Sequence, residues 1–522
     1  MAETILVAGA TGYVGGRLVP MLLSAGHKVR VYARNPAKLA DRPWARHENL
    51  EIATGDIFEP DKLNAAIQGC TIVYYLIHSM TDPGDFSESD RRAAYNMVEA
   101  LKCSAVKRII YLSGITPHDI KVSPHLRSRD EVRRILSLGS VPITTLQASQ
   151  IIGVGSASFE MLRYLADRLP FLIAPTWVDT KTQPISMSNV LVYLIEVMEH
   201  PETAGQTYDI GGPDIISYRD LLNIYTETAS LPRRRILTFP GFPLWLVAAI
   251  IGLISPIPRP LAKALTEGMR NQVICKDNRI LTIIPQNLLS VRQAVGRALG
   301  KTHRHEVDTS WLDAGMPAVP EWALTGDPAY TGGTLYSDSF RVLLNTSPDN
   351  IWPYLEKIGG ETGWYSTSFL WKARGLMDRL VGGPGVQRGR RSQTGLRLGD
   401  CLDFYRVMEI RPQQRLLLLA EMRLPGEGLL DLSLIPAESG HIYLYINLYY
   451  RPHGILGHLY WLGVTPFHSL AFKGMLRAIV KEAGVPIIAK PERTTALPIQ
   501  RPEASPKPAD QKKRNNESNN VG

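Results

Sequence analysis

The first half of the chain alternates short runs of β-branched and aliphatic residues with segments of helical periodicity. The runs predict strands that begin at Thr4, Val29, Leu50, Thr71, Arg108 and Ile143. The amphipathic segments between them predict helices at Pro60–Gln68, Arg91–Lys102 and Ser128–Leu138. Strands separated by such helices favour right-handed crossovers and a parallel sheet. Residues 1–300 are therefore predicted to form an α/β domain built on a doubly wound parallel sheet.

The pattern changes after residues 301–335, which are rich in Pro, Gly, Asp and Thr and predict a linker. Helices are then expected at Pro348–Ile358 and Pro466–Glu482. Strands are expected at Phe340–Leu344, Asp403–Ile410, Arg415–Met422, Leu429–Ile435 and His441–Tyr450. This order predicts an α+β domain at residues 336–487, whose antiparallel sheet grips the last helix. Residues 488–522 hold few large apolar side chains and predict a disordered tail.

A sheet that grips a helix encloses an apolar cavity, and Trp364, Trp371 and Trp461 are expected to line part of it. Tryptophan suits such a wall because its bulk is apolar while its N–H anchors a polar ligand end. The predicted ligand is an apolar small molecule. The alternative is that these side chains simply fill the core.

Residues 239–257 form an apolar stretch that proline brackets at both ends. The stretch is shorter than the roughly 20 residues that a membrane-spanning helix needs. A buried or interface helix is one interpretation. The other is a helix lying on a membrane surface, because the triplet Arg233–Arg235 precedes the stretch and Arg259, Lys263 and Arg270 follow it.

Composition narrows the classes of partner. The 522 residues are 44% hydrophobic and 20% charged, as in a soluble protein of two or three folded units. The net charge of +9 suits anionic partners such as a dinucleotide or an acidic membrane surface. Nucleic acid is not expected, because neither zinc-finger spacing nor an aromatic–basic RNA motif accompanies the charge.

The cysteines and histidines predict neither a disulfide framework nor a metal site. The four cysteines, at positions 70, 103, 275 and 401, are scattered without a C-x-x-C pair. His303, His305 and Glu306 lack a third ligand cluster, so an exposed linker is the expected context. The chain begins directly with a strand, so no secretory signal is expected. A cytoplasmic location is predicted, with peripheral attachment to the inner membrane face as an extension.

The strongest chemical signal is the glycine-rich turn after the first strand, whose residues are Gly9, Thr11, Gly12, Tyr13, Val14 and Gly15. The first glycine permits a tight turn, the second lets backbone N–H groups approach a pyrophosphate, and the third packs the helix on the strand. The phosphates then lie at a helix N-terminus, which favours negative charge. The strand–turn–helix context predicts dinucleotide binding.

The end of the second strand indicates which dinucleotide binds. It carries Arg34, with Lys38 one turn later, and lacks the acidic residue that binds a ribose 2′-hydroxyl in NAD sites. Cations at this position suit the 2′-phosphate of NADP. NADP is therefore predicted ahead of NAD, against the alternative of a solvated basic loop.

The first 300 or so residues resemble the atypical, NmrA-like branch of the short-chain dehydrogenase/reductases, which implies a Rossmann fold. The likeness is carried by the glycine-rich turn, Arg34, Gly55-Asp56-Ile57, Tyr111-Leu112-Ser113-Gly114 and Asp209-Ile210-Gly211-Gly212-Pro213. It implies that Asp56 and Ile57 border the adenine. It also places Ser113 where the family keeps its catalytic serine.

The sequence departs from this family at the decisive position. The family carries Tyr-x-x-Ser-Lys, where tyrosine transfers the substrate proton and lysine holds the nicotinamide ribose. The corresponding residues here run from His125 to Arg129. His125 is a candidate proton donor and Arg129 a candidate ribose contact. The alternative is an inactive site that retains only the ribose contact.

Residues 340–482 resemble a domain of unknown function that bacteria often fuse to such Rossmann domains. The likeness lies in Gly363-Trp364-Tyr365, Trp371-Lys372-Ala373-Arg374-Gly375 and Gly382-Gly383-Pro384-Gly385, among other motifs. Its element order is similar to START-like (SRPBCC) helix-grip folds, which hold hydrophobic ligands. The leading functional prediction is an oxidoreductase that acts on an apolar carbonyl or quinone-like substrate. The alternatives are a non-catalytic NADP(H) sensor or regulator, and a membrane-associated assembly or lipid-binding protein.

Overall fold

The computed structural model describes residues 3–497 except 41, 79–85, 118–121, 242, 256, 258, 304–308, 310–333, 388–389, 393–394 and 438–439. The chain divides into two compact units. One comprises Met1–Met316 with Leu376–Gln393, and the other comprises Pro317–Gly375 with Thr394–Gly522. Most of the predicted linker and residues 498–522 of the predicted tail lie outside the described residues.

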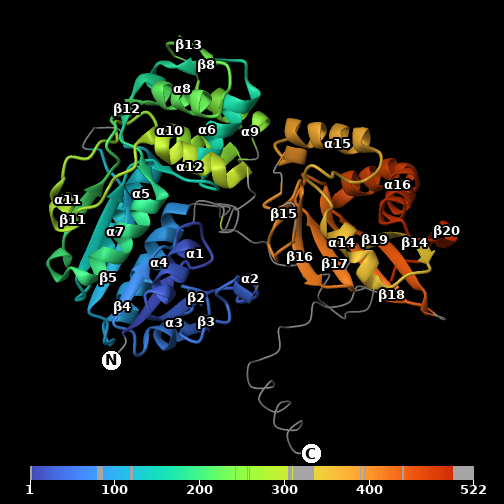
Figure 1. The fold of residues 1–522 in the computed structure, drawn as a ribbon, viewed down its shortest axis with the longest axis horizontal. Coiled ribbons are helices and arrows are strands. Elements are labelled where there is room, and N and C mark those ends of the chain that lie inside the picture. The colour runs from blue at the N-terminus through green and yellow to red at the C-terminus, as the bar shows by residue number, and fades with distance from the viewer. Residues whose placement is uncertain are drawn as a thin grey trace, which may run out of the picture. The chain divides into compact units, whose positions relative to one another are not determined.

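The first unit is built on a seven-stranded parallel sheet with the strand order β11-β6-β5-β4-β1-β2-β3 (Figure 1). The order reverses between β1 and β4, where open α/β sheets bind ligands. The strands are β1 (Thr4–Ala8), β2 (Lys28–Ala33), β3 (Leu50–Thr54), β4 (Ile72–Tyr75), β5 (Arg108–Gly114), β6 (Ile143–Ala148) and β11 (Thr207–Ile210). The predicted doubly wound parallel sheet is confirmed.

Helices cover both faces of this sheet because the strands carry buried apolar side chains on both sides. One face packs against α1 (Gly15–Ser24) and α7 (Met187–Glu199). The other packs against α3 (Pro60–Ile67), α4 (Phe86–Leu101) and α5 (Pro124–Leu136).

Helix α5 begins earlier than the predicted start at Ser128. The side chain of Ser123 accepts a hydrogen bond from Leu126 N at 3.4 Å, and Pro124 occupies the first helical position. Both features start a helix. His125 therefore lies in the first turn of α5, ahead of the predicted helix.

Further elements extend the first unit beyond the carboxyl ends of the strands. They include α6 (Ala157–Arg168), β8 (Phe171–Pro175), α8 (Tyr218–Thr228), β13 (Arg235–Phe239), α9 (Leu244–Ile254), α10 (Arg259–Gly268) and α12 (Val291–His303). The apolar stretch 239–257 yields α9, a helix of 11 residues. Ala248 and Ile251 are buried, while Trp245 is 67% exposed, so α9 is only partly buried. No helix among the described residues has the length and hydropathy to cross a membrane.

The second unit contains a seven-stranded sheet in which every neighbouring pair is antiparallel. Its order is β15-β16-β17-β18-β19-β14-β20. The strands are β14 (Tyr336–Leu344), β15 (Cys401–Leu402), β16 (Tyr405–Arg411), β17 (Arg415–Ala420), β18 (Gly426–Pro436), β19 (Ile442–Pro452) and β20 (Ile487–Thr494). Strand β20 lies within the range predicted as a tail, which corrects the start of that tail.

The long helix α16 (Gly454–Ala483) packs against β14, β19 and β20, while α14 (Trp352–Glu356) and α15 (Ser368–Leu380) precede the sheet's middle strands in the chain. The prediction that this helix begins near Pro466 is wrong. Pro466 lies inside α16, although proline usually marks a helix start or a break. The predicted α+β domain is present, and the START-like helix-grip assignment stays a prediction.

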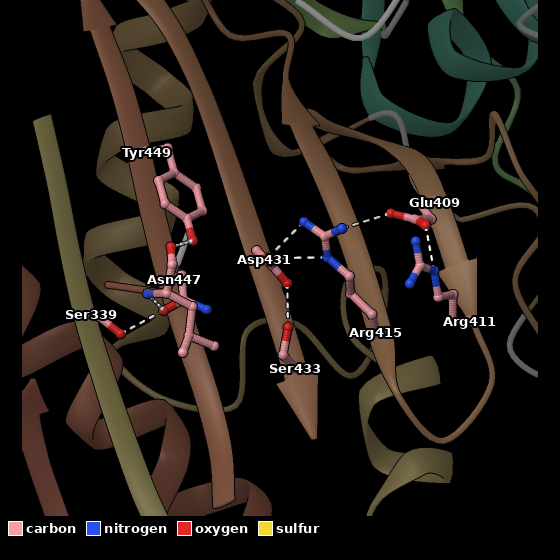
Figure 2. Close-up of polar contacts among 9 residues, drawn as sticks. Ser339, Glu409, Arg411, Arg415, Asp431, Ser433, Asn447 and Tyr449 are labelled. Atoms are coloured by element: carbon pink, nitrogen blue, oxygen red, sulfur yellow. Dashed lines mark hydrogen bonds and ion pairs between the residues drawn. The ribbon is translucent and has the colours of Figure 1, made fainter. Parts of the chain in front are cut away.

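Polar side chains cross one face of this sheet (Figure 2). Arg415 Nη1 donates to Glu409 Oε2 at 2.9 Å, and Arg415 Nη2 donates to Asp431 Oδ2 at 2.9 Å. Ser433 Oγ donates to the second oxygen of Asp431 at 2.6 Å. Charges this deeply buried are tolerated because each has a partner.

The three predicted cavity-lining tryptophans contact neighbouring aromatic rings. Trp364 lies 5.2 Å from Trp371 between ring centroids, and its Nε1 donates to Asp403 Oδ2 at 2.9 Å. Trp461 stacks against Tyr336 at 5.4 Å. These contacts favour the alternative that the indoles fill the core.

Candidate functional site

The glycine-rich turn joins β1 to α1 at the point where the strand order reverses. Gly9 has a φ of +99°, and a Cβ there would lie 2.7 Å from the carbonyl oxygen of Leu76. At Gly15 a Cβ would lie 2.3 Å from the carbonyl oxygen of Gly9. Both positions therefore need glycine for the chain itself to fold.

Gly12 requires glycine for a different reason. A Cβ at Gly12 would meet only the carbonyl oxygen of Gly9, at 3.3 Å, and Gly12 lines a cavity of about 400 Å³. No side chain caps the start of α1, where Val14 is the N-cap residue. An uncapped helix start and a glycine open to the cavity fit the pyrophosphate of a dinucleotide.

Other residues of the turn hold it in place. The side chain of Arg17, in the first turn of α1, lies over the Tyr13 ring at 4.2 Å and donates to Val154 O at 2.8 Å. Thr309 Oγ1 donates to the Tyr13 carbonyl at 2.9 Å, so a residue of the predicted linker supports the turn. Burial raises the pKa of the Tyr13 phenol to about 12, which keeps the phenol neutral. Of the predicted turn residues, Gly9, Gly12, Tyr13, Val14 and Gly15 line the cavity.

The predicted adenine-binding residues come together at the ends of β2 and β3. Arg34 Nη1 lies 3.9 Å from Asp56 Oδ2, and the side chain of Arg34 is 59% exposed. Ile57 is buried and its carbonyl accepts a hydrogen bond from Asn96 Nδ2 at 3.0 Å. Lys38 lies in the short helix α2 (Ala37–Ala40), which follows Arg34. An exposed guanidinium at this edge is available to an anionic ligand.

The predicted catalytic residues also meet in the cavity. Ser113 is the penultimate residue of β5 and is 3% exposed, and His125 of α5 lines the same cavity. His125 Nδ1 and Ser113 Oγ are buried and form no hydrogen bond of normal geometry with the described residues, although the Ser113 hydroxyl is close enough to the Tyr111 phenol to interact with it. A buried polar atom without a partner costs about 1–3 kcal/mol, so His125 Nδ1 fits a ligand that satisfies it.

Arg129 is fixed at the end of β5. Its Nη2 donates to Leu112 O at 2.7 Å, and its backbone carbonyl accepts a hydrogen bond from Tyr111 OH at 3.2 Å. The guanidinium carbon lies 5.3 Å from the centre of the Tyr111 ring. Arg129 lines the same cavity and stays charged, so it fits the predicted contact with a ribose.

Two residues of this site escaped the sequence prediction. His78 follows β4, and its Nδ1 lies 3.0 Å from Oδ2 of Asp90, a buried residue of α4. Ser128 Oγ donates to the same carboxylate oxygen at 3.2 Å. The His78 ring lies 5.1 Å from the His125 ring between centroids. Asp90 thus orients His78 beside the candidate proton donor.

The surroundings of His125 favour the neutral imidazole. Burial lowers the pKa of His125 well below the ordinary value of 6.5. The neighbouring His78 and Arg129 act in the same direction, and Asp90 opposes them. His125 also lies at the positive end of the α5 dipole, which disfavours a cation. At neutral pH the imidazole is therefore mostly uncharged.

The rest of the cavity wall is largely apolar. Its apolar members are Leu76, Leu112, Leu126, Ala148, Ile151, Ala157, Met161, Leu261, Ala264, Leu265, Met269 and Val273. Its polar members are Ser149, Gln150, Ser156, Ser158, Thr182 and Tyr218. Among the described residues, no group of His, Cys, Asp and Glu could hold a metal ion. His305 and Glu306 lie outside the described residues.

Comparison with known proteins identifies the two parts of the chain. Residues 9–148 match a family described as NAD(P)H-binding. The first unit contains an NAD(P)H-binding domain. Residues 330–475 match a protein family of unknown function, DUF2867. The NAD(P)H-binding match thus agrees with the glycine-rich turn, and the activity has to be argued from the site.

Several relatives share the NAD(P)H-binding part. A photosystem II assembly factor of Trieres chinensis is 22% identical over 256 residues, which are 48% of this chain and 77% of that protein. The mitochondrial NADH dehydrogenase (ubiquinone) 1 alpha subcomplex subunit 9 of Arabidopsis thaliana is 25% identical, over 49% of this chain and 65% of that protein. A dihydroflavonol 4-reductase of Zea mays is 34% identical over 21% of this chain, and the match spans only 34% of that reductase.

Solved structures also resemble the first unit. A nucleoside-diphosphate-sugar epimerase from Staphylococcus aureus has a TM-score of 0.47 at 18% identity, covering 56% of this chain and 100% of that one. The Bordetella bronchiseptica enzyme WbmG in complex with NAD has a TM-score of 0.46 at 14% identity, covering 60% and 97%.

Proposed function

We propose that this protein is an NADP(H)-dependent reductase of an apolar carbonyl or quinone-like compound. One observation carries the proposal. His125 Nδ1 is buried without a hydrogen-bond partner among the described residues, and the buried Ser113 hydroxyl, which interacts with the Tyr111 phenol, lines the same cavity as His125 and the glycine-rich turn. Two polar atoms in a largely apolar cavity fit a substrate with a single polar group, and a carbonyl oxygen accepts hydrogen bonds from both.

The preference for NADP rests on the adenine edge. Arg34 is largely exposed, and its ion pair with Asp56 is long at 3.9 Å. Glu59 Oε2 accepts a hydrogen bond from the Asp56 backbone N–H. This neighbouring glutamate therefore bonds to the turn's own backbone. A 2′-phosphate at this edge would gain a charge-assisted hydrogen bond from Arg34, with Lys38 as the second cation of the segment.

The residues of the chain have separate tasks in this reaction. The turn at Gly12 and the start of α1 hold the pyrophosphate, and Arg129 holds the ribose. When bound, NADPH supplies the hydride that reduces the carbonyl carbon. Ser113 Oγ donates a hydrogen bond to the carbonyl oxygen and polarises it. The imidazolium form of His125 gives that oxygen its proton and regains one from water.

His78 and Asp90 act on His125 indirectly. Asp90 fixes the His78 ring beside His125, and the charged form of Asp90 favours the imidazolium that donates the proton. Because burial lowers the pKa of His125, only a small fraction of the protein carries this imidazolium at neutral pH. Slow turnover at pH 7 that quickens in mild acid follows from this arrangement.

A second function is favoured by the departure from the reductase pattern. His125 and Arg129 replace the tyrosine and lysine of the short-chain reductases, and two relatives are named as an assembly factor and a respiratory-complex subunit. In this alternative the protein binds NADP(H) without turnover and acts as a sensor or as a membrane-associated assembly or lipid-binding protein.

NADPH consumption over a panel of quinones, enones and aldehydes separates the two functions. The reductase proposal expects consumption above the protein-free rate for at least one apolar compound, and none for matched polar aldehydes. NADPH binding by calorimetry with no consumption across the panel would contradict turnover and favour the non-catalytic function.

A further inference from the structure

A second cavity, of about 250 Å³, adjoins the first in the same unit. It is enclosed by α6, α8, β8, α9 and the end of α10. Its lining is almost wholly aliphatic or aromatic. The two cavities share the wall residues Gln150, Met161, Tyr218 and Met269. An apolar space therefore adjoins the substrate cavity.

The polar character of the wall changes at Gln150. Its Oε1 atom is buried and forms no hydrogen bond with the described residues. Gln150 lines the first cavity together with Ser113 and His125, and it lines the second together with side chains such as Leu162 and Ile250. This arrangement fits an amphiphilic molecule, with a polar head in the first cavity and an apolar chain in the second.

The second cavity adjoins an exposed apolar surface. Strands β8 and β13 form a two-stranded parallel ribbon in which Ile173 pairs with Leu237. Figure 1 shows this ribbon at one end of the first unit, beside α8. The ribbon patch consists of Phe171 (55% exposed), Ile173 (45%), Leu237 (55%), Phe239 (56%) and Trp245 of α9 (67%).

Two residues belong to both features. Phe171 and Ile173 line the second cavity and are also exposed in the ribbon patch. Helix α9 likewise contributes Val247 and Ile250 to the cavity wall and Trp245 to the patch. The apolar interior therefore reaches the surface where that surface is itself apolar.

The segment from β13 to the start of α10 carries only positive charges, while Asp179, which follows β8, is paired with Arg219, whose Nη1 donates to Ile236 O of β13. Between Glu227 and Glu267 the chain has no acidic residue, whereas it carries the Arg233–Arg235 triplet, Arg259 and Lys263. Arg235 is exposed and pairs in register with Phe171 of the patch. Cations beside an exposed apolar surface complement anionic lipid headgroups over an apolar bilayer interior.

We propose that the ribbon patch rests on an anionic lipid surface and admits a lipid-soluble substrate to the second cavity. The apolar chain of this substrate lies in the second cavity while its carbonyl or quinone head reaches Ser113 and His125. The identity of the polar head rests on the proposed function. The ribbon patch and the binding of an apolar chain in the second cavity do not depend on that function. Such a substrate partitions into lipid rather than water, so an entrance at the lipid surface supplies it.

Vesicle sedimentation of the full chain tests the patch. Wild-type protein is expected to bind phosphatidylglycerol vesicles and to bind phosphatidylcholine vesicles at least fivefold more weakly, since each cation near an anionic surface contributes. The double variant Phe239→Glu/Trp245→Glu should lower binding at least about tenfold. Both residues are exposed, so the variant should fold, which circular dichroism checks.

Two matched variants show whether the effect is specific. Leu138→Glu changes a residue that is 74% exposed elsewhere in the first unit, and Leu456→Glu/Leu459→Glu changes exposed residues of α16. Both should bind vesicles as the wild type does. Loss of binding in the α16 variant alone, or a patch variant that still binds, would overturn the patch proposal. Binding of a protein partner without any vesicle binding would also overturn it.

Chain length tests the second cavity without requiring turnover. Quinones with one head and side chains of increasing length are titrated against the protein by quenching of tryptophan fluorescence. Affinity should rise about fourfold per buried methylene until the cavity is full. Ala174→Leu, which fills part of the cavity, should end that rise at a shorter chain. Affinity independent of chain length would contradict the proposal.

These results distinguish the two proposals. Vesicle and chain-length binding without NADPH consumption would leave the lipid-facing cavity standing and reject the reductase. NADPH-dependent reduction of short-chain quinones, with neither effect, would keep the reductase and reject this inference.

Discussion

Gly12 and Gly15 share a motif but differ in what a side chain would meet. A Cβ at Gly15 would lie 2.3 Å from the backbone, whereas one at Gly12, which lines the cavity, would meet only the Gly9 carbonyl oxygen at 3.3 Å. Gly15 is thus required by the fold, and Gly12 is proposed to serve the ligand. Sequence spacing gave both the same weight, because spacing does not show which direction is open.

Gly12→Val is expected to abolish dinucleotide binding while the protein stays folded. The branched side chain would fill the space needed by the pyrophosphate and would meet only one backbone oxygen. Calorimetry with NADPH and circular dichroism check the two halves of this prediction. Gly15→Val is the matched comparison and should destabilise the first unit itself. Retained NADPH affinity in Gly12→Val would show that this turn does not hold the phosphates.

Arg34→Gln should weaken NADPH binding about tenfold or more and leave NADH binding nearly unchanged. A charge-assisted hydrogen bond contributes roughly 1.5–3 kcal/mol, and only NADPH has a phosphate to accept it. Arg46→Gln, which removes an exposed arginine of the segment before β3, is the control. Equal losses for both dinucleotides would argue against recognition of the 2′-phosphate.

At the scale of elements, α5 determines the state of His125. The Ser123 cap starts the helix early enough to bury His125 in its first turn, beside His78 and Arg129. His125 and Arg129 line the same cavity as Ser113, which the sequence could anticipate because β5 and α5 follow one another in the chain. It missed His78 and Asp90, because only tertiary packing brings the β4 loop and α4 to that site.

Stability should reflect the lowered pKa of His125. Above pH 6.5 His125 is neutral in both the folded and the unfolded chain, so its contribution to pH dependence is absent. As the pH falls below 6.5 the unfolded chain takes up a proton that the folded chain resists, and stability declines. His125→Gln should remove up to about 1.4 kcal/mol of this loss per pH unit.

Urea unfolding at pH 7.5 and 5.5 measures this difference, with the exposed His453 replaced by Gln as the control. An acid sensitivity identical in wild type and His125→Gln would contradict the burial argument.

The polar network of the second sheet is a further element-scale feature. Asp431→Leu would leave the buried Arg415 with one carboxylate in place of two, and should cost about 3–5 kcal/mol of unfolding free energy. Glu492→Leu breaks the Arg341–Glu492 pair, whose glutamate is 54% exposed, and should cost less than about 1 kcal/mol. Denaturant unfolding compares the two variants. Equal losses of unfolding free energy would show that burial does not determine how much these ion pairs stabilise the fold.

At the scale of the whole molecule, each unit exposes an apolar surface. The first has the ribbon patch, and the second has one side of α16, with Ile455, Leu456, Leu459 and Leu462 all more than half exposed. The alternating pattern predicted both sheets. Burial of one or both faces of a strand determines which of its positions are apolar, and this spacing is visible in the sequence. The second cavity could not be predicted from the sequence. Its walls come from α6, α8, β8 and α9, which are separated along the chain and come together only by tertiary packing.

Helix α16 shows why pattern alone misplaces boundaries. The sequence predicts a helix start at Pro466, yet the helix runs through it from Gly454. The segment before Pro466 is apolar and partly exposed, so it lacks the usual contrast between buried and polar positions. The sequence therefore located the domain and understated its longest helix.

The rate of NADPH consumption as a function of pH, in wild type and His125→Ala, tests the central claim most directly. With the best apolar substrate, the wild-type rate should rise as the pH falls from 8 to 6, because the imidazolium fraction of a low-pKa histidine grows about tenfold per unit. His125→Ala should lower the rate at pH 6 at least about 100-fold and flatten the profile. A wild-type rate that survives His125→Ala unchanged, with the same pH profile, would contradict the account.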